Sequence, residues 1–120
     1  MWHVLVVPQI KLYAKDVYGA LKLELTKKSD DVNILLRQLR KNHCDDVSAL
    51  MTNDLESAVM DICPQLMTLK MRMEKLGFLK VLVSGSGPCV YGFARSEEEA
   101  LGIKKNLDKK YSRVFVAHTF

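Results

Sequence analysis

Hydrophobic residues are arranged along the chain in two kinds of pattern, short continuous runs and helical repeats. Continuous apolar runs bounded by turn residues are typical of strands. Such runs occupy residues 2–7, 79–83, 89–94 and 113–118. The first run ends at Pro8 and lacks regular alternation, so we expect a buried strand rather than an alternating edge strand. Only a Gly-rich segment separates the second and third runs, which predicts an antiparallel pair.

Apolar residues also recur at the i, i+3, i+4 and i+7 positions that line one face of a helix. The strongest example comprises Leu55, Ala58, Val59 and Ile62. Each repeat is bounded by polar, Gly or Pro residues, which are typical of helix ends. The pattern predicts helices over residues 14–25, 32–41, 55–63, 64–76 and 96–111, with one further turn of helix over 45–50.

Several of these helices carry boundary signals. Asn53 is well placed to cap the helix that follows it, and Pro64 can begin the next helix because its missing N–H costs nothing there. Gly77 is typical of a helix C-terminus, and Ser96 with Glu99 forms a capping box. Flexible thioether side chains in these helices are expected to fill the core. They belong to Met67, Met71 and Met73.

The predicted order is strand, several helices, strand, strand, helix, strand. This is the split β-α-β pattern of ferredoxin-like domains. We therefore expect an α+β fold with an antiparallel four-stranded sheet and an elaborated helical first crossover. A length of 120 residues with 48% hydrophobic and 27% charged residues supports a single domain over residues 1–120 and excludes a disordered chain. The fold alone assigns no function, because many functions share it.

Charge and cysteine content narrow the classes of partner and compartment. The net charge is +4, but the basic residues are spread over predicted helix ends and polar helix faces, which is typical of a solvated surface. Cys44, Cys63 and Cys89 lack the spacing of a metal site or a disulfide framework, so we expect free thiols, a reducing compartment and no metal. No apolar run approaches a membrane span, and the chain opens directly into a strand, so we expect a cytoplasmic protein without a leader. The histidines also lack a metal-binding pattern: His3, His43 and His118.

The segment Ser84-Gly85-Ser86-Gly87-Pro88 is the one whose composition requires a special explanation. Its glycines permit positive φ or close approach to another surface, and its serines add hydroxyl and amide donors, which suits a phosphate neighbour. Pro88 is expected to restrict Gly87 to an extended shape. The segment matches neither a Walker loop nor G-x-G-x-x-G opening a helix. A hairpin turn would also use such residues, so structural and functional interpretations both remain open.

A family resemblance depends on this loop and on its flanks. Residues 81–93 read VLVSGSGPCVYGF, residues 53–56 read NDLE, and residues 96–100 read SEEEA. With the opening 4–8 and Tyr18, the chain resembles the C-terminal domain of the 4-diphosphocytidyl-2-C-methyl-D-erythritol kinase family. That family lies within the galactokinase, homoserine kinase, mevalonate kinase and phosphomevalonate kinase superfamily. The resemblance covers nearly all 120 residues but only the second half of the family's chain.

The sequence departs from the family before its first predicted helix. The family usually has Ser-Thr at this point, whereas this chain has Tyr13-Ala14. A hydroxyl cap contributes about 1 kcal/mol to a helix, so its loss leaves the start of this helix undefined.

The resemblance implies a kinase that uses ATP and Mg²⁺ to phosphorylate a hydroxyl of 4-diphosphocytidyl-2-C-methyl-D-erythritol, in non-mevalonate isoprenoid biosynthesis. The family's ATP loop and its catalytic Lys and Asp lie in an N-terminal domain that is absent here, so Met1 is expected to mark the junction between two domains. This chain would contain no catalytic residue, bind no cofactor tightly and be inactive alone. It would present Gly85, Ser86 and Gly87 to the substrate or phosphate region. Its partners would be the N-terminal domain and the small-molecule substrate, without nucleic acid or membrane, and the isolated domain is expected to self-associate.

Two alternatives from other classes remain open. RNA-recognition domains share the ferredoxin-like order and carry aromatic residues on their third strand, as residues 91–94 do here. The flanks differ, because Cys89-Val90 stands where Lys/Arg-Gly is expected and Ser96 stands where an aromatic is expected. A small-ligand sensor domain on the same fold is the second alternative, and ligand binding by the isolated domain would distinguish it.

Overall fold

The computed structural model describes residues 1–20, 37, 40 and 49–119. Four strands and four helices are defined in these ranges. They are, in order, β1 (Trp2–Val6), α1 (Ala14–Ala20), α4 (Glu56–Ile62), α5 (Pro64–Lys75), β2 (Lys80–Val83), β3 (Val90–Ala94), α6 (Glu97–Asp108) and β4 (Val114–His118). The helix predicted over 32–41, apart from residues 37 and 40, the end of the first predicted helix and most of the turn predicted over 45–50 lie outside the described residues.

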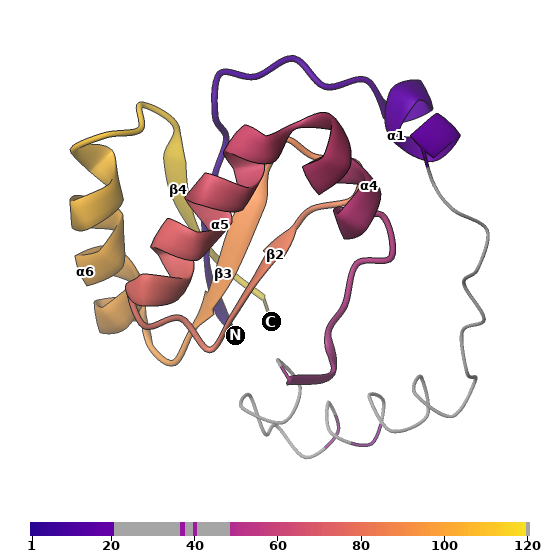
Figure 1. Cartoon of the computed structure of the whole chain (residues 1–120). Coiled ribbons are helices and arrows are strands. Elements are labelled where there is room, and N and C mark those ends of the chain that lie inside the picture. Colours follow the sequence, from indigo (N-terminus) through magenta and orange to yellow (C-terminus); the bar gives the residue numbers. More distant parts are fainter. Residues whose placement is uncertain (21–36, 38–39, 41–48, 120) are drawn as a thin grey trace.

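The four strands form one antiparallel sheet in the order β2-β3-β1-β4. Helices α5 and α6 pack against the same face of this sheet (Figure 1). The crossover from β1 to β2 contains α1, α4 and α5, and the crossover from β3 to β4 contains α6. The α+β ferredoxin-like fold with an elaborated first crossover, predicted from the sequence, is therefore confirmed.

The hydrophobic core lies between the sheet and its helices. Val4 and Val6 of β1 are fully buried against this layer, together with Leu66 of α5. His3 and Leu5 alternate with the valines and remain half-buried. The expectation of a strand without alternation was therefore wrong. The reason is that β1 is central in the sheet and directs Val4 and Val6 toward the layer of α5 and α6, whereas His3 and Leu5 lie on the other face of the sheet.

The predicted helix boundaries are mostly confirmed. Pro64 is the first residue of α5, and Gly77, with φ of +95°, follows its end. The hydroxyl of Ser96 accepts the N–H of Glu99 at 3.1 Å, which caps α6. The other half of the predicted capping box differs, because the carboxylate of Glu99 faces the guanidinium of Arg95 at 3.5 Å.

Helix α1 begins at Ala14 despite the missing Ser-Thr pair. The carbonyl of Tyr13 accepts the N–H groups of Asp16 and Val17 at 3.1 and 3.3 Å, which closes the first turn through the backbone. Val17 then anchors the helix in the core, since it is fully buried.

The methionines of α5 divide between two faces of the helix. Met73 is fully buried, as expected, but Met67 and Met71 are 43% and 51% exposed. The core-filling prediction was wrong for these two because they lie one turn apart on the face opposite Leu66 and Leu69. Among the described residues, no helix is long and apolar enough to span a lipid bilayer.

Candidate functional site

The Gly-rich segment forms a tight loop between β2 and β3. The N–H of Ser84 donates to the carbonyl of Cys89 at 2.8 Å, and the N–H of Gly87 donates to the carbonyl of Ser84 at 2.9 Å. Gly85 and Gly87 have φ of +53° and +77°, the left-handed region that favours glycine. The extended shape expected for Gly87 was wrong, because a residue without Cβ escapes the restriction that Pro88 would impose on other residues.

The two glycines of the loop face different surroundings. A Cβ on Gly85 would meet no atom within 4 Å, whereas one on Gly87 would lie 3.0 Å from Cδ2 of Leu12. It would also lie 3.5 Å from side-chain atoms of Val59 and Leu66. Gly87 therefore lets the base of the loop pack closely against α4 and α5, while Gly85 belongs to the exposed tip of the loop.

The loop tip presents consecutive backbone donors. Within the described ranges, the N–H groups of Gly85 and Ser86 have no protein acceptor, in contrast to those of Ser84 and Gly87. Successive free N–H groups in a turn can bind an anion, and the hydroxyl of Ser86 is a further donor beside them. The structure thus brings the three predicted site residues into one loop and makes Gly85 and Ser86 its donor-bearing part.

Asn53 connects this loop to the segment before α4. Its side-chain Nδ2 donates to the carbonyls of Val83 and Gly85, both at 2.8 Å. Its Oδ1 accepts the N–H of Leu55 at 3.1 Å. The prediction of Asn53 as the helix cap was wrong, because α4 begins at Glu56 with Leu55 in the cap position. Sequence reasoning missed the loop contact, although the NDLE motif marked the segment.

Glu56 completes the connection at the edge of the sheet. Its Oε2 accepts the N–H of Val83 at 3.2 Å, and its Oε1 pairs with the ammonium group of Lys70 on α5. Strand β2 has a neighbour on one side only. Asn53 therefore binds the carbonyl of Val83 and Glu56 binds its N–H, two groups that pair with no strand among the described residues.

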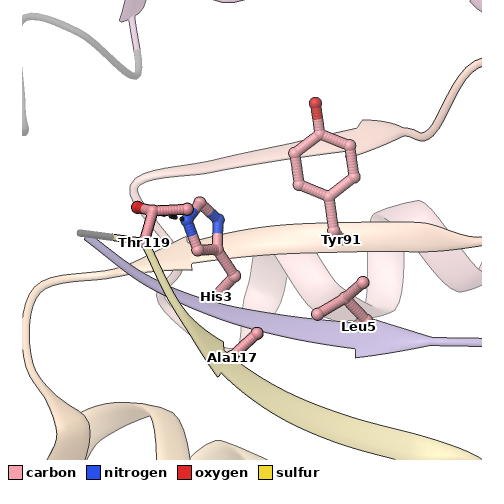
Figure 2. A pocket seen from close by; sticks show the side chains of 5 residues that line it. All are labelled: His3, Leu5, Tyr91, Ala117 and Thr119. Atoms are coloured by element: carbon pink, nitrogen blue, oxygen red, sulfur yellow. Dashed lines mark hydrogen bonds between the residues drawn. The ribbon is translucent and has the colours of Figure 1, made fainter.

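A separate hollow of about 210 Å³, lined by five residues, lies on the face of the sheet opposite α5 and α6. Figure 2 shows them: His3, Leu5, Tyr91, Ala117 and Thr119. The Nε2 of His3 lies 3.2 Å from the hydroxyl oxygen of Thr119. Burial raises the pKa of Tyr91, and the Glu56 carboxylate and Cys89 raise it further. The hollow therefore presents a neutral phenol and contains none of the Gly-rich loop residues.

The cysteines and histidines considered from the sequence add, within the described residues, no reactive or metal-binding group to the Gly-rich loop. Burial raises the pKa of the Cys89 thiol beside the loop, which disfavours a reactive thiolate. His3 and His118, which are distant in the sequence, lie on the paired strands β1 and β4, while His43 is outside the described residues. In the part of the chain that the structure describes, no three His, Cys, Asp or Glu residues are grouped to hold a metal ion.

Comparison with known proteins identifies the class. Residues 24–113 match the family described as "GHMP kinases C terminal". The chain therefore belongs to this family of kinase C-terminal domains, as the loop and its flanks indicated.

Its relatives include a more particular group, the 4-diphosphocytidyl-2-C-methyl-D-erythritol kinases. That of Alkaliphilus oremlandii (strain OhILAs) is 32% identical over 119 residues, which are 99% of this chain and 41% of the relative. The crystal structure of a 4-(cytidine 5'-diphospho)-2C-methyl-D-erythritol kinase is similar with a TM-score of 0.80 and 25% identity, over 97% of this chain and 41% of that one. Homoserine kinase from Cytophaga hutchinsonii shares the fold at 21% identity and a TM-score of 0.81, over 98% of this chain and 41% of that one. The chain thus spans about two-fifths of the length of these proteins.

Proposed function

We propose that this chain is the C-terminal domain of a kinase that transfers the γ-phosphoryl group of ATP to a hydroxyl of 4-diphosphocytidyl-2-C-methyl-D-erythritol. Membership of the GHMP kinase family and the names of the relatives support this reaction. The main structural support for the proposal comes from the loop tip. There the N–H groups of Gly85 and Ser86 have no protein acceptor within the described residues. Such donors suit a phosphoryl oxygen.

The role of the loop is to hold negative charge during phosphoryl transfer. Charge on the transferred group is spread over its oxygens, and donors fixed in advance stabilise it without reorganising. Gly85 and Ser86 would bind such an oxygen through their N–H groups. Gly87 would act indirectly, because it packs against Leu12, Val59 and Leu66 and so fixes the height of the loop above the helices.

ATP and Mg²⁺ are expected for the intact enzyme. The free N–H groups of the loop fit a phosphate oxygen of the nucleotide. A metal ion, when bound, would neutralise charge on the phosphates, but the described residues contain no cluster of metal-ligating side chains. The ligands of this metal ion and the catalytic residues are expected in the remaining part of the kinase.

The proposal also covers the organisation of the protein. Residues 1–120 would form one domain around the described core, and the rest of the kinase would be its partner. The free cysteines Cys63 and Cys89 are consistent with a reducing, cytoplasmic compartment. Exposed apolar side chains, including Met67, Met71 and Phe115, would promote self-association of the isolated chain. Sedimentation at two concentrations tests this, and a constant molecular mass would contradict it.

A coupled assay of ADP formation tests the reaction. The full-length kinase containing this segment should turn over ATP only when 4-diphosphocytidyl-2-C-methyl-D-erythritol is present, whereas the purified 120-residue chain should be inactive. No turnover by the full-length protein would overturn the proposed reaction. Substrate-dependent turnover by the chain alone, surviving removal of contaminating kinase, would overturn the division of roles. Tight, salt-sensitive binding of single-stranded RNA would instead favour the RNA-binding alternative.

A further inference from the structure

The side chain of Asn53 binds the carbonyl groups of the two residues that flank Ser84. Its Nδ2 lies 2.8 Å from the oxygen of Val83, which ends β2, and 2.8 Å from that of Gly85 at the loop tip. One planar amide group can donate both of its hydrogens only to acceptors that lie in suitable directions. Asn53 therefore restricts the relative orientation of the two peptide groups, and with it the course of the chain into the loop tip.

The orientation of the Asn53 amide is itself fixed. Its Oδ1 accepts the N–H of Leu55 at 3.1 Å, so a flipped amide would bring Nδ2 against another donor and Oδ1 against two carbonyl oxygens. An aspartate could keep the contact with Leu55, but its second oxygen would face the two carbonyls without a hydrogen. The contact thus depends on the amide rather than on side-chain size.

A second connection holds the same point of the sheet to the helical layer. Glu56 accepts the N–H of Val83 at 3.2 Å and pairs with Lys70 on α5. The side chains of Glu56 and Lys70 are only 15% and 19% exposed. Val83 is therefore held through both of its backbone polar groups, while the N–H groups of Gly85 and Ser86 beyond it have no acceptor in the part of the chain that the structure describes.

We propose that Asn53 is a positioning residue for the kinase reaction, holding the loop in the conformation in which the N–H groups of Gly85 and Ser86 bind a phosphoryl oxygen. This inference rests on the proposed kinase function. The oxygen can belong to ATP or to the diphosphate of the acceptor, because both present the same chemistry. Asn53 touches neither substrate in this arrangement, since its three polar contacts are all made to the protein.

The anchoring contact can be tested by NMR on the 120-residue chain, independently of activity. The side-chain N–H₂ protons of Asn53 should exchange with solvent at least about tenfold more slowly than those of Asn106, which is exposed on α6. In Asn53→Asp, the backbone N–H of Gly87 should exchange faster, whereas Asn106→Asp, the same chemical change, should leave it unaltered. Equal exchange of the two wild-type side chains would overturn the anchor even if Asn53→Asp failed to fold.

The positioning role can be tested by steady-state kinetics of the full-length kinase. In Asn53→Asp, the KM for ATP or the KM for the acceptor should rise about tenfold, the size expected when a hydrogen bond to a charged group is lost. The substrate whose KM rises is the one whose phosphate the loop binds. Partial unfolding lowers the amount of active enzyme without moving a KM, so this readout separates positioning from stability.

Asn106→Asp serves as the matched kinetic control and should leave both KM values unchanged. Unchanged KM values in Asn53→Asp, together with faster exchange at Gly87, would overturn the positioning role while leaving the anchor in place. An inactive wild-type kinase would overturn the proposed function, and the positioning role with it. The exchange measurements would still report whether Asn53 holds the loop.

Discussion

The ring of Phe78 lies directly against the backbone of Gly92 in β3. A Cβ placed on Gly92 would be 2.6 Å from Cγ of the ring and 2.7 Å from both Cδ atoms, closer than carbon atoms can approach. Phe78 follows α5 and packs against the hydrophobic core. The absence of a side chain at Gly92 therefore lets an aromatic ring cover the strand.

Gly92→Ala should lower the free energy of unfolding by about 1–3 kcal/mol, because the ring must move out of its packed position. Urea unfolding of the 120-residue chain would measure this. Gly102→Ala is the matched control, since Gly102 lies within α6 and its Cβ would meet nothing within 4 Å. That variant should gain about 0.5–1 kcal/mol from helix propensity. Similar losses in the two variants would contradict the packing role of Gly92.

Gly87→Val should lower turnover of the full-length kinase and also destabilise the chain. A β-branched residue at φ of +77° is strained, and its side chain would meet Leu12, Val59 and Leu66. We expect a loss of at least about 2 kcal/mol in urea unfolding. Gly85→Ala, in open space at φ of +53°, should cost only about 1 kcal/mol. Equal losses would contradict the difference in packing, and unchanged kinetics of Gly87→Val would contradict the place of the loop at the substrates.

His3 should make the stability depend on pH. Burial, and after it the N-terminal ammonium and His118, hold the pKa of His3 below its ordinary value of 6.5. Between pH 6.5 and the lower pKa of the folded state, His3 is therefore protonated more readily in the unfolded chain than in the folded chain. The free energy of unfolding consequently falls as the pH drops through this range. Thermal unfolding at several pH values would show a shallower dependence in His3→Gln. Identical pH profiles for the two proteins would contradict this effect.

Lys70→Met should destabilise the chain by about 1–2 kcal/mol, because the Glu56 carboxylate would keep its place beside Val83 without its cation. The side chains of Lys70 and Glu56 are mostly shielded from solvent, whereas those of Lys104 and Asp108 are 32% and 43% exposed. Lys104→Met should therefore cost no more than about 0.5 kcal/mol. Urea unfolding of both variants gives the comparison, and a smaller loss for Lys70→Met than for Lys104→Met would contradict it.

The sequence was most informative where a short segment determines its own structure. Pro64 begins a helix, Gly77 ends one and Ser96 caps another because each acts on backbone groups within a few residues. The order of strands and helices along the chain then allowed few topologies, and the observed four-stranded antiparallel sheet is the one that was expected. The Gly-rich loop was likewise recognisable, since its residue types are unusual between two strands.

Contacts between distant segments were the part that sequence reasoning missed. Asn53 looked like a helix cap, but its amide binds carbonyls 30 and 32 positions further along the chain. The shape of Gly87 depends on the space left between Leu12, Val59 and Leu66, which no local rule describes. For Asn53 and Gly87, the residue type suggested a local role, but contacts with distant parts of the chain determined the observed conformation.

The contacts at Val83 have a further consequence for the sheet as a whole. An edge strand with free N–H and carbonyl groups can template the addition of a strand from another molecule, which is a common route to aggregation. At the loop end of β2 those groups are occupied by Asn53 and Glu56. An incoming strand would have to displace both side chains before it could pair there. The residues that hold the loop therefore also limit growth of the sheet at this edge.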